Sequence, residues 1–105
     1  MAICVIALSL LSYGQGSNER AFTFAWLSDV HLNSFAYAED DLRQSIEDIN
    51  ANPDVAFTIL SGDVTEFGDT KEFYLLQDIL KNFRKPYFLI PGNHDVNWSE
   101  NGCTM

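Results

Sequence analysis

Three short segments of the chain carry the residue types that could do chemistry. They are Ser28-Asp29-Val30-His31, Ser61-Gly62-Asp63-Val64-Thr65-Glu66 and Pro91-Gly92-Asn93-His94-Asp95, and they contain both histidines of the sequence. Carboxylate and amide oxygens together with imidazole nitrogens form a mixed shell that suits Mn, Fe or Zn. The residue types therefore predict a metal site, provided that the fold brings the three segments together.

Each segment has a physical reason to bind metal. In an extended chain the residues i and i+2 point the same way, so Asp29 and His31 could share one ion. Gly62 allows a sharp turn that brings Asp63 close to the site, and the two oxygens of Asp63 could bridge two ions. The amide oxygen of Asn93 is a neutral, hard ligand.

The third segment also holds a candidate acid. His94 would be available for acid chemistry, and Asp95 could orient the ring of His94 as its hydrogen-bond partner. Purely structural roles stay open for both residues. Asp29 could be a turn residue or a helix cap, and His94 could be a structural histidine in a turn. Glu66 could support the second segment through hydrogen bonds or be an exposed residue before a helix. The order of three such segments favours the metal site.

The elements that must position these segments alternate between two periods. Apolar runs predict buried strands, and residues at helical spacing predict amphipathic helices. The expected order is strand Ala21–Leu27, helix Ala38–Asn50, strand Val55–Leu60, a second helix, and strand Tyr87–Ile90. This β-α-β-α-β pattern predicts an α/β fold with a parallel sheet, in which ligands bind beyond the carboxyl ends of the strands. Each of the three segments follows one of these strands.

Both helices carry recognisable signals. Leu42, Ile46 and Ile49 form the apolar stripe of the first, which Asn52-Pro53-Asp54 ends because the residue before proline avoids helical geometry. Asp69 or Thr70 can cap the second, and Glu72 completes a capping box if Asp69 is the cap. The apolar positions of the second helix, together with Trp26 in the first strand, are interpreted as core.

Length and charge limit the remaining possibilities. The chain has 105 residues, 47% of them hydrophobic, and a formal net charge of −9 from fifteen acidic and six basic residues. That length allows one domain at most. The acidic balance argues against a nucleic-acid polymer and against anionic membrane surfaces as partners.

The N-terminus predicts export. Ala2–Leu11 is apolar but far too short to span a membrane stably, and its length fits the apolar region of a signal peptide. We therefore expect a signal peptide at residues 1–14, a linker at 15–20, and a periplasmic or secreted protein. The alternative is a buried first strand. Neither Cys4 nor Cys103 lies in a metal-type spacing.

The motifs resemble a known family. Asp29-x-His31, Gly62-Asp63-x-x-Glu66 and Gly92-Asn93-His94-Asp95 are similar to the first three motifs of the calcineurin-like metallophosphoesterase superfamily, across roughly Phe22 to Trp98. The resemblance implies that residues 21–105 are the N-terminal part of such a domain, the first half of a four-layer α/β/β/α sandwich. It also implies hydrolysis of small phosphoric mono- or diesters by a metal-activated hydroxide.

The resemblance further implies a role for each site residue. Two divalent or trivalent ions (Mn, Fe or Zn) would be bound, the first by Asp29 and His31 and the second by Asn93, with Asp63 bridging them. His94 would act near the leaving group, hydrogen-bonded to Asp95.

Two departures from the family pattern qualify this reading. The second motif has no tyrosine, which argues against a purple acid phosphatase. No histidine follows His94, although the family completes its metal shell with later histidines. We therefore expect the chain to be the front part of a longer enzyme. The alternative is a catalytically inactive fragment or a scaffolding member of the same fold. A nucleotide-binding α/β domain is disfavoured, because no glycine-rich loop follows the first strand.

Overall fold

The computed structural model describes residues 2–8, 21–33 and 36–96. Within them a single four-stranded sheet has the order β1-β2-β3-β4, in which β2, β3 and β4 are parallel and β1 is antiparallel to β2. Two longer helices and one short helix complete the described part of the chain. In sequence order the elements are β1 (Ala2–Leu8), β2 (Phe22–Ser28), α1 (Ala38–Ala51), β3 (Val55–Ser61), α2 (Thr70–Leu80), β4 (Tyr87–Ile90) and α3 (Asn93–Val96).

The parallel part of the sheet confirms the predicted β-α-β-α-β order. Leu27 of β2 pairs with Leu60 of β3, which pairs in turn with Leu89 of β4. The carboxyl ends of the three strands are therefore level with one another. The three segments of chemical interest emerge side by side at this edge, as the sequence predicted.

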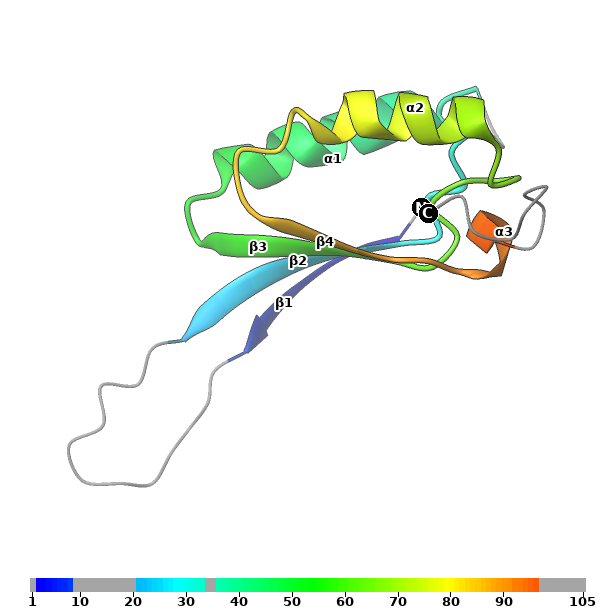
Figure 1. Ribbon diagram of the computed structural model, residues 1–105. Coiled ribbons are helices and arrows are strands. Elements are labelled where there is room, and N and C mark those ends of the chain that lie inside the picture. The colour runs from blue at the N-terminus through cyan, green and yellow to red at the C-terminus, as the bar shows by residue number, and fades with distance from the viewer. Residues whose placement is uncertain (1, 9–20, 34–35, 97–105) are drawn as a thin grey trace, which may run out of the picture.

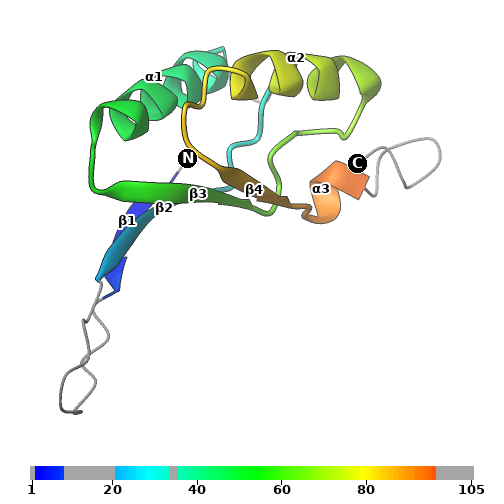
Figure 2. The ribbon, with the colours of Figure 1, turned by 60° about the vertical axis from the view of Figure 1, so that its left-hand side comes forward.

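Both long helices cover the same face of the sheet (Figures 1 and 2). Leu42, Ile46 and Ile49 of α1 are buried there, which confirms the predicted stripe. They join Ala25 and Leu27 of β2 in the core, which continues into the buried residues of α2. Burial of a large aliphatic side chain contributes about 1.5–3 kcal/mol, so this layer contact is a main source of stability.

The helix signals have their expected structural counterparts. Asp69 caps α2, and its carboxylate accepts a hydrogen bond from the Glu72 amide at 2.9 Å while the Glu72 carboxylate accepts one from the Asp69 amide at 3.1 Å. The capping box is therefore present. Helix α1 ends at Ala51, and its C-cap Asn52, directly before Pro53, has extended backbone geometry.

The second face of the sheet is not covered by any described residue. Successive side chains of a strand point to opposite faces, so Ala25 and Leu27 meet the helices while Trp26 points away and is 40% exposed. The prediction that Trp26 is core is wrong for this part of the chain. Other apolar residues of the sheet are exposed as well, among them Phe22 of β2 and Phe88 and Ile90 of β4. The second sheet of the expected four-layer sandwich would pack against this kind of face.

The N-terminal segment forms a strand. Residues Ala2–Leu8 pair with β2 from Ala2↔Ser28 to Leu8↔Phe22, which adds an antiparallel edge that the predicted topology lacked. A strand at the N-terminus is the alternative interpretation of this segment. The signal peptide stays a prediction. Residues 9–14, the linker 15–20, Trp98 and Cys103 lie outside the described residues. No described helix is long and apolar enough to cross a membrane.

Candidate metal centre

The loops beyond β2 and β3 continue the pairing of their strands. The amide of Asp29 donates to the Gly62 carbonyl at 3.2 Å, and the amide of His31 donates to the Asp63 carbonyl at 2.9 Å. One residue further, Leu32 donates to Val64 at 2.9 Å. These backbone bonds hold the first two motifs side by side well past the ends of the strands.

Left-handed backbone geometry is concentrated in these two motifs. Asp29, His31 and Asp63 have φ values of 55°, 47° and 50°, and Gly62 has 68°. Non-glycine residues adopt this region rarely, and such conformations cluster at functional sites. The prediction that Asp29 and His31 form an extended pair is therefore wrong in its geometry. The predicted sharp turn at Gly62 is confirmed.

The turned backbone nevertheless brings the first ligand group together. Ligand atoms of Asp29, His31 and Asp63 lie within 4.8 Å of one another. Nε2 of His31 is 3.8 Å from Oδ1 of Asp29. Two carboxylates and one imidazole at this separation are a donor set that fits a divalent ion of the Mn, Fe or Zn type.

A second group of side chains shares His31 with the first. His31, Glu66 and His94 also offer ligand atoms within 4.8 Å of one another. A carboxylate oxygen of Glu66 lies 2.8 Å from Nδ1 of His31, and the backbone carbonyl of Glu66 lies 2.7 Å from Nδ1 of His94. Of the two open interpretations of Glu66, the structure therefore favours support of the loop through hydrogen bonds.

The third motif is fitted closely against the second. The amide of His94 donates to Oδ1 of Asp63 at 2.9 Å, so Asp63 is held by the first residues of α3. A Cβ atom on Gly92 would lie 2.3 Å from the Asp63 amide nitrogen, which leaves no room for a side chain. Asn93 opens α3 and is exposed beside His94, at the same edge of the sheet.

Asp95 makes contacts that the sequence did not predict. Its buried carboxylate accepts hydrogen bonds from the Val64 amide at 3.2 Å, the Thr65 amide at 2.8 Å, the Thr65 hydroxyl at 2.7 Å and the Gly92 amide at 2.8 Å. The prediction was a bond that orients the ring of His94. The contacts seen in the structure instead join the loop after β3 to the loop after β4.

The surroundings of His94 favour its protonated form. The hydrogen bond to the Glu66 carbonyl raises the pKa of His94 above its usual value, and partial desolvation opposes this. The negative charges of Asp63, Glu66 and Asp95 raise the pKa further. A histidine that holds its proton more firmly is suited to act as an acid.

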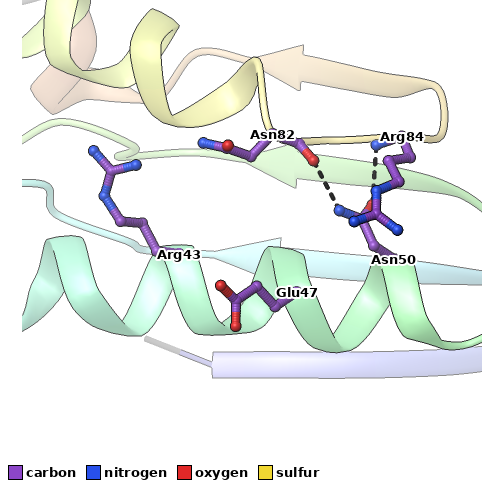
Figure 3. A pocket seen from close by; sticks show the side chains of 5 residues that line it. All are labelled: Arg43, Glu47, Asn50, Asn82 and Arg84. Atoms are coloured by element: carbon purple, nitrogen blue, oxygen red, sulfur yellow. Dashed lines mark hydrogen bonds between the residues drawn. The ribbon is translucent and has the colours of Figure 1, made fainter.

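A separate hollow lies away from this edge. It is lined by residues of α1 and of the turn between α2 and β4: Arg43, Glu47, Asn50, Asn82 and Arg84 (Figure 3). The Asn50 side chain donates to the Asn82 carbonyl at 2.8 Å and accepts from the Arg84 amide at 3.0 Å. These contacts tie the helix to the turn and indicate a structural role.

Comparison with known proteins identifies the family. The family model for calcineurin-like phosphoesterases matches residues 22–104, so the chain belongs to this family. Its parallel strands and one-sided helix layer agree with the first half of the metallophosphoesterase fold.

Several curated relatives are phosphodiesterases by name. The chain is 31% identical to a probable glycerophosphodiester phosphodiesterase of Arcobacter nitrofigilis, over 66% of this chain and 28% of that protein. It is 33% identical to a glycerophosphodiester phosphodiesterase of Enterobacter lignolyticus, over 68% and 28%. It is 39% identical to a probable cyclic nucleotide phosphodiesterase of Rhodopseudomonas palustris, over 42% and 16%. The chain thus spans less than a third of the length of these relatives.

Proposed function

We propose that the protein is a metal-dependent phosphoesterase that hydrolyses small phosphoric diesters. The observation that carries the proposal is the convergence of Asp29, His31 and Asp63 within 4.8 Å at the ends of adjoining parallel strands. Membership of the calcineurin-like phosphoesterase family and the names of the relatives support the reaction class. We favour diesters over monoesters as the substrate class, because the relatives named above are phosphodiesterases by name.

The donor set fits a dinuclear centre. Asp29 and His31 would hold one ion, Asn93 the other, and Asp63 would contact both with its two oxygens. Mn, Fe and Zn all suit these donors. When bound, a metal pair lowers the pKa of water and neutralises charge on a phosphoryl group.

The remaining site residues supply positioning and a proton. The bond from His94 to Asp63 holds this carboxylate in place without using its second oxygen. With Nδ1 directed at the Glu66 carbonyl, Nε2 of His94 would pass a proton to the departing alkoxide. The raised pKa of His94 keeps it protonated over a wider range of pH. Asp95 would contribute by holding the two loops together.

The proposal is tested by hydrolysis of bis(p-nitrophenyl) phosphate by the full-length protein with added Mn²⁺. Asn93→Ala and His94→Ala should each lower turnover by about 100-fold, the scale expected of a metal ligand or a general acid. Asp54→Asn, in the exposed turn before β3, is the matched control and should leave turnover unchanged. Equal turnover in all four proteins would overturn the assignment. A protein that binds Mn²⁺ at these residues but hydrolyses no ester would be a binding member of the family.

We also propose that the protein is exported, which the apolar N-terminal segment supports. Strand β1 and a cleaved signal peptide exclude each other in the mature protein, because both use Ala2–Leu8. N-terminal sequencing of the mature protein decides between them. Export predicts that the mature chain starts near Gln15, whereas a mature chain that retains residues 2–8 would contradict it.

A further inference from the structure

Glu66 contacts both histidines of the chain at once. Its carboxylate lies 2.8 Å from Nδ1 of His31, and its backbone carbonyl lies 2.7 Å from Nδ1 of His94. The two rings stand edge to face, with 5.0 Å between their centres and an angle of 82° between their planes. A single residue therefore contacts the same nitrogen of both rings.

These contacts define which nitrogen carries the proton. A carboxylate and a carbonyl can only accept hydrogen bonds, so Nδ1 is the donor in each ring. In His31 this leaves the lone pair on Nε2, which is the nitrogen that faces Oδ1 of Asp29 at 3.8 Å. Metal-binding histidines commonly depend on such a partner, which fixes the tautomer and strengthens the ligand.

The backbone of Glu66 is itself held in place. Its amide donates to the Leu32 carbonyl at 3.1 Å, and the neighbouring Thr65 pairs with Leu32 in a parallel bridge. Thr65 is fully buried, and its amide and hydroxyl both bond to Asp95. Glu66 thus projects from a fixed segment of the loop, and its side chain is 21% exposed.

We propose that Glu66 is a positioning residue that sets the tautomer of His31 and thereby prepares Nε2 for metal. Its carbonyl does the same for Nδ1 of His94. This inference rests on the proposed metal centre. This positioning role differs from the role of a metal ligand. A ligand carboxylate would bind the ion itself, whereas the Glu66 carboxylate accepts a hydrogen bond from Nδ1 of His31.

Two variants separate positioning from ligation. Glu66→Gln keeps an oxygen that can accept from Nδ1 of His31, whereas Glu66→Ala removes it. The exposed Glu47 of α1 provides the control Glu47→Gln. Because the backbone carbonyl remains in each variant, the bond to His94 should persist, which makes His94 an internal reference.

The first measurement is nitrogen NMR of the histidine rings in the metal-free, full-length protein. The wild type should show His31 with the proton on Nδ1, Glu66→Gln should retain that tautomer, and Glu66→Ala should lose it. An unchanged tautomer of His31 in Glu66→Ala would overturn the proposal. This result does not depend on whether the protein is an enzyme.

The second measurement is the affinity for Mn²⁺ by calorimetry. Glu66→Ala should bind Mn²⁺ about 10–100-fold more weakly, Glu66→Gln should recover most of that loss, and Glu47→Gln should match the wild type. Equal losses in the Gln and Ala variants would show that Glu66 is a ligand and would overturn the positioning role. If the wild type binds no Mn²⁺, the metal centre fails, while the NMR result still decides the role of Glu66.

Discussion

Asp95 offers a sharp test of how the site is held together. One carboxylate oxygen accepts from the amide and hydroxyl of Thr65, and the other accepts from the amides of Val64 and Gly92. Asp95→Asn keeps one oxygen and replaces the other with an NH₂ group. In either orientation of the asparagine amide, its NH₂ group replaces the oxygen that accepted two of these hydrogen bonds, so two donors lose their acceptor.

The magnitude follows from these bonds. A buried donor without an acceptor costs about 1–3 kcal/mol, so two of them predict a loss of about 2–6 kcal/mol in Asp95→Asn. Asp95→Ala removes all four bonds, and its loss should be larger than that of Asp95→Asn. Since the free energy of unfolding of a protein is about 5–15 kcal/mol, either loss is a large share of it.

Urea denaturation of the full-length protein, followed by circular dichroism, measures both losses. Asp54→Asn makes the same chemical change at an exposed position and should shift stability by no more than about 0.5 kcal/mol. If Asp95→Asn were as stable as this control while turnover fell, Asp95 would act through the ring of His94, as the sequence suggested. That result would contradict a stabilising role for the four hydrogen bonds of Asp95.

Two further substitutions test neighbouring parts of the fold. Gly92→Ala places a Cβ atom 2.4 Å from Oδ1 of Asp63, so we expect loss of Mn²⁺ affinity and a lower urea midpoint. Gly62→Ala meets open space and should cost only about 1–2 kcal/mol for its positive φ; similar midpoints for the two variants would contradict the steric argument. Glu72→Ala leaves two loop amides before α2 without their acceptor and should lower the free energy of unfolding by about 1–3 kcal/mol, measured by urea denaturation. The exposed Glu47→Ala is its control, and equal stability of the two would count against the buried capping box.

The sequence predicted the parallel strands and both helices because their periodicity and caps are local signals. Leu42 and Ile46 repeat at helical spacing, and Asp69 precedes Glu72 at the distance of a capping box. The order of the strands then placed the three motifs at one edge without knowledge of any contact. Local pattern was sufficient for this level of description.

What the sequence could not predict depends on contacts between distant segments. Two partners of Asp95, Val64 and Thr65, lie some thirty positions earlier in the chain, and no pattern near Asp95 predicts them. The bond between His31 and Glu66 likewise joins two loops that meet only after the strands have paired. Trp26 was assigned to the core because an apolar run does not say which of its two faces is covered.

The most direct test of the metal centre is a crystal structure of the full-length protein with Mn²⁺, phased to reveal the anomalous signal of the metal. We predict manganese bound by a carboxylate oxygen of Asp29, by Nε2 of His31 and by Asp63, with Asn93 beside a second ion. A metal signal elsewhere, or coordination of His31 through Nδ1, would contradict it.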